Sequence, residues 1–309
     1  MTQVAVIGAG LIGRAWSIVF ARAGFNVALW DPVAPAVEAA LGFIRERLPE
    51  LREAGLLADE PSAVLARIRP AATMEAAVQD AEHVQENSPE RLADKKKLFA
   101  ALDTAARSDA VLASSTSGIP ASKFTKNLSG RARCLVAHPV NPPYLVPLVE
   151  LCPAPWTDPA VVTRTRALMS RAGQAPVTVN KELAGFALNR LQGALLAEAF
   201  RLLADGAISA ADLDATVKHG LGLRWSFMGP LETIDLNAPG GLADYCTRYG
   251  GLYAELQQQM TPHEWDADLV GKLHTARRAE LPANMLAVRQ EWRDRRLMAL
   301  LSHKASQPE

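Results

Sequence analysis

Residues that can move a proton or bind a substrate oxygen follow one another along the middle of the sequence. His138 comes directly after the apolar segment 134–137, Ser114–Ser117 ends an earlier apolar segment, and Glu150 lies within a later one. Because ligands bind at the carboxyl ends of the strands in an open parallel sheet, these side chains can converge at one edge. A neutral imidazole suits a general base at neutral pH, and a carboxylate on its far ring nitrogen would orient it.

The same residues also have simpler explanations. A histidine beside prolines is often structural, and a glutamate near a sheet edge is often only solvated. Serine, histidine and glutamate together would also fit a hydrolase triad. No G-x-S-x-G sequence surrounds these serines, however, and a hydrolase would leave the glycine motif near the start of the chain unexplained.

That glycine motif follows the short apolar segment Val4–Ile7, which is typical of a strand buried on both faces. Gly8 permits a tight turn, Gly10 lets the backbone approach a pyrophosphate, and Gly13 lets the following helix, 14–23, pack closely on the strand. The pyrophosphate would then lie on the N–H groups at the start of that helix. The turn predicts a dinucleotide site.

A lone G-x-G-x-x-G is weak evidence, but here strand, turn, helix, second strand and acid occur in order. The second strand, 25–30, ends in Asp31, whose carboxylate can accept hydrogen bonds from the adenosine ribose hydroxyls. The same carboxylate would repel a 2′-phosphate, and the next residues supply no arginine to offset it. The predicted cofactor is therefore NAD and not NADP.

Further elements follow the same alternation. Strand-like segments occupy 110–114, 134–137 and 147–151, and helical segments occupy 35–57 and 94–107. A long apolar helix is expected over 184–204, Ser209 begins a further helix, 280–303 is helical, and we expect no strand after 185. The fold class is α/β: a Rossmann-type doubly wound parallel sheet over residues 1–185, followed by an all-α domain over residues 186–309.

Composition narrows the class of protein. Of 309 residues, 49% are hydrophobic, and 33 basic residues balance 33 acidic ones, which gives no general electrostatic reason to bind nucleic acid or a membrane surface. The three cysteines are too widely spaced for a disulfide framework or a metal site. With no targeting or membrane-spanning segment apparent, a cytoplasmic location is expected. The long apolar helix also favours a homodimer through the helical domain.

The sequence resembles the L-3-hydroxyacyl-CoA dehydrogenase family, and within it the lambda-crystallin / L-gulonate 3-dehydrogenase branch. The resemblance covers both predicted domains and rests on five segments: GAGLIGR at 8–14, SSTS at 114–117, AHPVNPP at 137–143, GFALNRLQ at 185–192 and GPLET at 229–233.

This resemblance implies roles for particular residues. His138 would be the general base, Glu150 its partner, and Ser117 and Asn189 would hydrogen-bond the substrate oxygen and the base. An amide on the apolar face of a long helix is in any case costly to bury without a polar partner. The cofactor contacts implied by the resemblance fall on Leu11, Ile12, Asp31, Glu90, Lys95 and Asn141.

The segment 220–230 bears on the substrate, because it carries Arg224 where acyl-CoA members of the family have a shorter, apolar segment. A guanidinium can hold a carboxylate through two hydrogen bonds. The same arginine could instead have a structural role at the domain junction. We expect NAD-dependent oxidation of a small L-3-hydroxy acid resembling L-gulonate.

Three further functions fit the same motifs. One is oxidation of L-carnitine, which the low aromatic content of 6% disfavours, because a trimethylammonium group needs an aromatic surround. The second is oxidation of an L-3-hydroxyacyl-CoA such as 3-hydroxybutyryl-CoA. The third is a crystallin-like structural role, since a fold can be retained without its activity.

Overall fold

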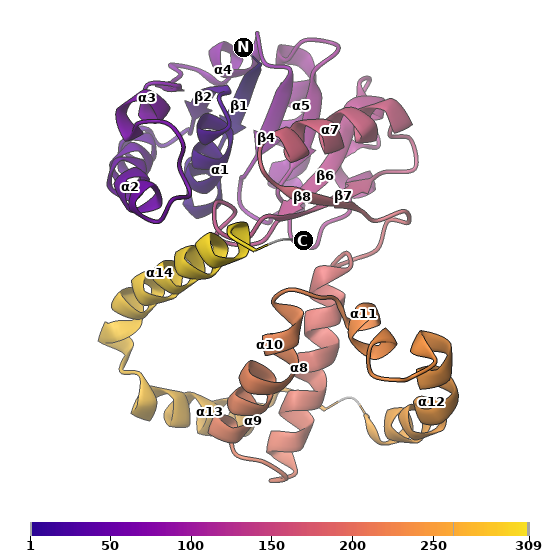
Figure 1. The fold of residues 1–309 in the computed structure, drawn as a ribbon. Helices are drawn as coiled ribbons and strands as arrows, with labels where there is room; N and C mark the ends of the chain where they lie inside the picture. Colours follow the sequence, from indigo (N-terminus) through magenta and orange to yellow (C-terminus); the bar gives the residue numbers. More distant parts are fainter. Residues whose placement is uncertain (1, 262, 308–309) are drawn as a thin grey trace. The chain divides into compact units, whose positions relative to one another are not determined.

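A computed structural model describes residues 2–261 and 263–307, and the chain divides into two units (Figure 1). The first unit comprises Met1–Arg190 together with Arg293–Glu309, and the second comprises Leu191–Trp292. The first is built on a sheet. In the described part of the second, all regular structure is helical.

The sheet has eight strands in the order β3-β2-β1-β4-β5-β6-β7-β8. All neighbouring pairs are parallel except β6 and β7, which are antiparallel. The reversal of strand order beside β1 is that of a doubly wound nucleotide-binding fold, so the predicted fold class is confirmed. The strands are β1 Gln3–Ile7, β2 Asn26–Trp30, β3 Ile68–Pro70, β4 His83–Glu86, β5 Val111–Ser114, β6 Cys134–Pro139, β7 Leu148–Pro153 and β8 Ala175–Thr178.

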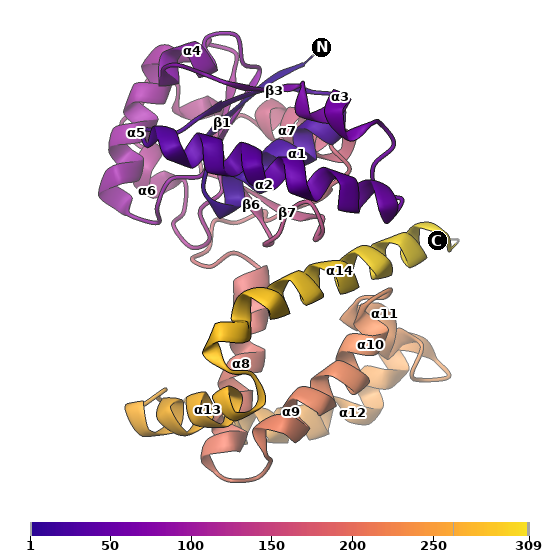
Figure 2. The ribbon, with the colours of Figure 1, turned by 90° about the vertical axis from the view of Figure 1, so that its left-hand side faces the viewer.

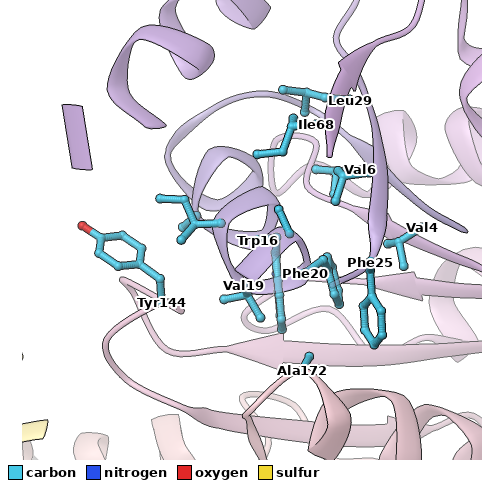
Figure 3. Close-up of a cluster of buried hydrophobic side chains, with 14 of the residues drawn as sticks. Val4, Val6, Trp16, Val19, Phe20, Phe25, Leu29, Ile68, Tyr144 and Ala172 are labelled. Atoms are coloured by element: carbon cyan, nitrogen blue, oxygen red, sulfur yellow. The ribbon is translucent and has the colours of Figure 1, made fainter. Parts of the chain in front are cut away.

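Helices cover both faces of this sheet. One apolar cluster joins it to α1, α2 and α7, and another joins it to α4, α5 and α6. Figure 2 shows α1 and α2 side by side on the first face. In the first cluster Trp16 stacks on Phe20 with ring centroids 5.1 Å apart, and Phe25 lies beside them (Figure 3). The helices are α1 Leu11–Arg22, α2 Ala34–Glu53, α3 Pro61–Leu65, α4 Met74–Val78, α5 Leu92–Ala105, α6 Ser122–Thr125 and α7 Pro159–Arg171, with a 3-10 turn at Arg131–Arg133.

Three strands were not predicted from the sequence. The strands β3 and β8 are short and lie at the two ends of the sheet order, and both contain proline. The strand β4 lies beside β1 in the middle of the sheet, yet three of its four residues are polar and all four are buried. Its sequence, His-Val-Gln-Glu, therefore lacks the apolar pattern by which a buried strand is recognised.

The second unit begins within α8 (Leu188–Ala204), whose first residues belong to the first unit. Ser209 is the N-cap of α9 as predicted, because its side chain accepts a hydrogen bond from the backbone N–H of Asp212. Among the described helices, none is long and apolar enough to cross a membrane. The remaining helices are α9 Ala210–Thr216, α10 Gly222–Trp225, α11 Pro230–Asp235, α12 Gly241–Gln259, α13 Ala267–Glu280 and α14 Leu286–Ala305, with a π-helical turn at Val217–Leu221 and a 3-10 turn at Ala283–Met285.

The last helix, α14, leaves the helical unit and ends in the sheet-containing one. From Arg293 onward it belongs with the first unit, where Met298 is buried in the α1–α2 cluster and Leu297 and Leu301 pack against it. The Tyr144 hydroxyl also donates a hydrogen bond to Asp294 at 3.1 Å. The described residues from Arg293 onward therefore do not belong to one helical domain over 186–309, as predicted, because the apolar face of α14 is buried in the α1–α2 cluster of the first unit.

Candidate active site

The glycine turn between β1 and α1 is held by its own packing at two of its three glycines. Gly8 has φ +94°, and a Cβ there would lie 2.9 Å from the carbonyl oxygen of Asn87. A Cβ on Gly13 would lie only 1.7 Å from the carbonyl oxygen of Gly8, so the helix can approach the turn only with glycine there. A Cβ on Gly10, by contrast, would meet nothing within 4 Å. Glycine at position 10 therefore leaves room for a ligand, as the predicted approach of a pyrophosphate requires.

Helix α1 begins at Leu11 with Gly10 as its N-cap, and no side-chain hydrogen bond caps it. Its first N–H groups and the positive end of its dipole therefore favour an anion at this end. Leu11 is 63% exposed and Ile12 is half-buried. The residues present thus fit the pyrophosphate of a dinucleotide.

Asp31 follows β2 directly and is tied to the same turn. Its two carboxylate oxygens accept hydrogen bonds from the backbone N–H groups of Ala9 and Val33, each at 2.8 Å. Beside it lies an open hollow of about 430 Å³, also lined by Trp30, Met74 and Glu75. The apolar side chains suit an adenine ring, and Glu75 adds a second carboxylate to the hollow, which would repel a 2′-phosphate bound in it.

Lys95, a predicted cofactor contact, is almost completely buried in an ion pair. Its ammonium donates to both carboxylate oxygens of Glu86, at 3.0 and 3.1 Å, and Ser114 donates to Glu86 at 2.6 Å. Glu86 ends β4 and was not singled out in the sequence. A buried ion pair of this kind requires both partners, because removing one leaves an unpaired charge.

Glu90, the other predicted contact on this segment, holds the loop that carries Ser117. Its carboxylate accepts hydrogen bonds from the backbone N–H groups of Ser117, at 3.0 and 3.1 Å, and Gly118, at 2.9 Å, and from the hydroxyl of Thr116. Burial pushes the pKa of Glu90 upward, but these hydrogen bonds and the charge of Lys95 outweigh it and leave the pKa lowered. Glu90 is therefore ionised at neutral pH, and its carboxylate holds the loop through these hydrogen bonds.

His138 and Glu150 are paired directly. The antiparallel register of β6 and β7 sets them opposite each other, and Nδ1 of His138 lies 2.8 Å from Oε2 of Glu150. Both are buried, at 5% and 1% exposure. Burial raises the pKa of Glu150, but hydrogen bonds from His138, Leu188 and Ala187 outweigh it, so the pKa is lowered. An ionised carboxylate only accepts, so Nδ1 carries the hydrogen and Nε2 of the neutral ring keeps the lone pair that a base needs.

The other oxygen of Glu150 binds the start of α8. It accepts from the backbone N–H groups of Ala187 and Leu188, both at 2.8 Å. The next residue, Asn189, donates its side-chain amide to the backbone carbonyl of Ser117 at 2.7 Å. The start of α8 thus connects two hydrogen-bonded pairs of predicted residues, His138 with Glu150 and Asn189 with Ser117.

Phe186 packs against His138 and was not singled out as a site residue from the sequence. It is completely buried, and its ring lies 5.5 Å from the His138 ring between centroids. Its backbone has φ 50°, a conformation that a bulky residue rarely adopts, and it follows Gly185 at φ 73°. Such strain is retained where the surroundings require it, here at the turn that leads into α8.

Two further predicted residues, Asn141 and Arg224, take part in none of the contacts described above. Asn141 is exposed in the segment just after β6. Arg224 lies on α10 in the helical unit, where its positive charge lowers the pKa of Tyr245, although a hydrogen bond with Tyr253 is the larger effect and leaves that pKa raised.

The glycine turn with its acid, and a buried histidine–carboxylate pair in the same unit, define a dinucleotide-dependent oxidoreductase. The family model for the 3-hydroxyacyl-CoA dehydrogenase NAD binding domain matches residues 3–183, and that for the C-terminal domain of the same enzymes matches residues 185–280. The chain belongs to the 3-hydroxyacyl-CoA dehydrogenase family. It is an NAD-dependent dehydrogenase acting on a CH–OH group, and the resemblance to this family and to its lambda-crystallin members is confirmed.

Among curated relatives, the lambda-crystallin homolog of Bos taurus is 47% identical and aligns with 99% of this chain and 97% of its own. The L-carnitine dehydrogenase of a Pseudomonas species is 34% identical, over 96% of this chain and 92% of its own. Among solved structures, an NAD+-dependent dismutase, 5-formyl-3-hydroxy-2-methylpyridine 4-carboxylic acid 5-dehydrogenase, superposes with a TM-score of 0.86 at 27% identity, covering 100% of both chains.

Proposed function

We propose that this protein oxidises the 3-hydroxyl group of a small L-3-hydroxy acid resembling L-gulonate to the 3-keto acid. The observation that carries the proposal is the buried hydrogen bond between His138 Nδ1 and Glu150, because it leaves Nε2 as a base. Bound NAD supplies the acceptor for the hydride that leaves C3.

In this reaction the O–H proton of the substrate passes to Nε2 of His138 as the C–H bond at C3 breaks and the C=O bond forms. The charge gained by the imidazole is stabilised by Glu150, which stays ionised because its pKa is lowered. Since Glu150 is also held by two backbone N–H groups of the α8 turn, the imidazole is oriented by a rigid partner.

Ser117 and Asn189 would hold the substrate oxygen. Both backbone polar groups of Ser117 are occupied, its N–H by Glu90 and its carbonyl by Asn189, so the direction of its side chain is restricted. Such positioning groups contribute by holding the reacting oxygen at hydrogen-bond distance from the base.

Arg224 is our candidate for binding the substrate carboxylate, since its planar fork matches that group. Two relatives lend support. The structure with a TM-score of 0.86 is named for a substrate that carries a carboxylic acid, and carnitine, the named substrate of another relative, is itself a 3-hydroxy acid.

L-carnitine is the second candidate. Three tyrosines on α12 gather into one aromatic group, with ring centroids of Tyr245 and Tyr249 4.7 Å apart and those of Tyr245 and Tyr253 6.3 Å apart. Aromatic faces attract a quaternary ammonium. The positive charge of Arg224 acts on Tyr245, however, and would oppose a second cation there. We therefore rank the sugar acid first.

A substrate panel tests the proposal. NAD reduction is followed by absorbance with L-gulonate, L-carnitine, L-3-hydroxybutyrate and L-3-hydroxybutyryl-CoA, each at the same enzyme concentration. The highest kcat/KM is expected with L-gulonate. A preference for the CoA thioester of at least tenfold would contradict the assignment of a free acid, and turnover of L-carnitine alone would select the second candidate.

We also propose a homodimer formed through the helical unit, and a cytoplasmic location. Large apolar side chains are exposed on this unit, among them Phe227, Leu231 and Leu236, each about two-thirds exposed. Sedimentation velocity should give a mass near twice 33.2 kDa, and Leu231→Asp with Leu236→Asp should reduce it to that of a monomer.

A further inference from the structure

The side-chain amide of Gln85 is buried at the centre of the nucleotide-binding unit and reaches two segments that carry proposed catalytic residues. Gln85 lies on β4 and is 0% exposed. Its Nε2 donates to the hydroxyl of Ser115 at 2.7 Å and to the backbone carbonyl of Ala137 at 3.1 Å. Ser115 lies two residues before Ser117, and Ala137 immediately precedes His138.

The directions of these hydrogen bonds follow from their partners. A carbonyl only accepts, so the amide nitrogen of Gln85 must face Ala137. The amide oxygen then faces His83, whose Nε2 lies 2.9 Å away and must donate. Burial lowers the pKa of His83 to about 4, so the ring is neutral at physiological pH with its hydrogen on Nε2. The Gln85 amide thus has a single orientation.

The Ser115 hydroxyl extends the network to α1 and to the end of β4. Besides Gln85, it accepts from the indole N–H of Trp16 at 3.0 Å and donates to Oδ1 of Asn87 at 2.7 Å. A hydroxyl offers one donor and two acceptor positions, and all three are used. Trp16 lies on α1, the helix that begins at the dinucleotide turn, and is completely buried in the apolar cluster (Figure 3).

We propose that Gln85 is a positioning residue, which holds the Ser117 loop and the His138 strand at the spacing that the reaction requires. The strand β5 lies between β4 and β6 and ends at Ser114. The side chain of Gln85, on β4, donates to the carbonyl of Ala137 on β6, one residue past the last paired position of β6 with β5. Backbone pairing joins β5 to β6 only up to Ser114 and Val136. Past that point the amide of Gln85 bridges the two segments.

The variant Gln85→Met tests the positioning role, because methionine has a similar volume and no N–H group to donate a hydrogen bond. We expect kcat on the best acid of the panel to fall about tenfold or more, since misplacement of reacting groups by about 1 Å is costly. The dissociation constant of NADH, measured by fluorescence titration, should change less than threefold, because Gly8 and Asn87 are held by backbone hydrogen bonds to Trp30 and Ile7. A primary deuterium isotope effect on kcat, with substrate deuterated at C3, should rise.

Gln174 offers a matched control. It is also buried in the first unit, and neither amide atom has a hydrogen-bond partner among the described residues. Gln174→Met therefore makes the same chemical change without breaking this network, and kcat should stay within twofold of wild type. If Gln85→Met does not fold, Ser115→Ala takes its place with the same expected results. Wild-type kcat in the folded variant, or an equal loss in Gln174→Met, would overturn the proposal.

This inference rests on the proposed roles of His138 and Ser117, so Ser117→Ala is measured in parallel. If Ser117→Ala is fully active, the proposed site fails. If Ser117→Ala loses activity while Gln85→Met keeps it, only the positioning role of Gln85 is wrong.

Discussion

A single carboxylate, that of Glu150, determines how the candidate site is assembled. One oxygen binds His138 and the other binds two N–H groups at the start of α8. The orientation of the imidazole and the position of Asn189 on that helix therefore depend on the same side chain. Sequence patterns could place Glu150 near a sheet edge, but not this division of its two oxygens.

The base is the first residue to test. His138→Gln should reduce kcat by roughly 10²–10⁴-fold, the range that general acid–base catalysis contributes. NADH affinity should hardly change, because among the described residues no hydrogen bond joins the dinucleotide turn or Asp31 to the His138–Glu150 pair. Steady-state kinetics and a fluorescence titration of NADH measure the two effects. A variant with kcat near that of wild type would show that another group takes the proton.

Cofactor choice depends on the carboxylates around the adenosine ribose. We expect NAD to be preferred over NADP by more than about tenfold in kcat/KM, equivalent to roughly 1.4 kcal/mol. Asp31→Ser should narrow the preference by relieving repulsion of a 2′-phosphate, and adding Glu75→Gln should narrow it further because Glu75 lines the same hollow. Equal use of both cofactors by the wild type would contradict these roles.

Among the elements, those with apolar or glycine patterns were predictable, and those with buried polar residues were not. The strands β1 and β2 with their turn follow the expected order. The strand β4 was missed because His83, Gln85 and Glu86 are polar and become buried only through partners on other elements and on one another. No short-range pattern shows such partners in advance.

The direction of β7 had a usable signal in the sequence. A crossover between parallel strands needs about a dozen residues or more, and only 140–147 separate β6 from β7. The short connection therefore favours an antiparallel pair, which sets Glu150 opposite His138. Contacts of Ser117 with Glu90 and Asn189, by contrast, join segments far apart in the sequence and required the structure.

The link between β7 and α8 through Glu150 should give a pH-dependent contribution to stability. The pKa of Glu150 is lowered in the folded state, so the ionised carboxylate stabilises the fold. This stabilisation is fully present above the unfolded-state pKa of about 4.3 and is lost as pH falls through the folded-state pKa. Urea unfolding of wild type and Glu150→Gln should thus show a difference in free energy at pH 7 that shrinks below about pH 4. A difference that stays constant down to pH 3 would contradict this linkage.

At the scale of the whole molecule, the proposed carboxylate anchor, Arg224, belongs to the helical unit. Arg224→Met should lower kcat/KM for the free acid by about 10²-fold, since charge-assisted hydrogen bonds contribute roughly 1.5–3 kcal/mol each. Arg224→Lys should restore only part of this, because an ammonium lacks the planar fork. NADH affinity should be unchanged. Wild-type kinetics in Arg224→Met would assign the arginine to a structural role.

The path of α14 also makes the helical unit an insertion in the chain of the nucleotide-binding unit, attached at both ends. The chain leaves the first unit after Arg190 and re-enters it at Arg293. One proteolytic cut between α12 and α13 would therefore release neither piece, because Met298 and Asp294 still anchor the far fragment to the first unit. The nicked protein should elute intact in gel filtration and retain NADH binding. Met298→Ala, which should cost about 2–5 kcal/mol by emptying a buried site, should let the two fragments separate at lower urea concentration.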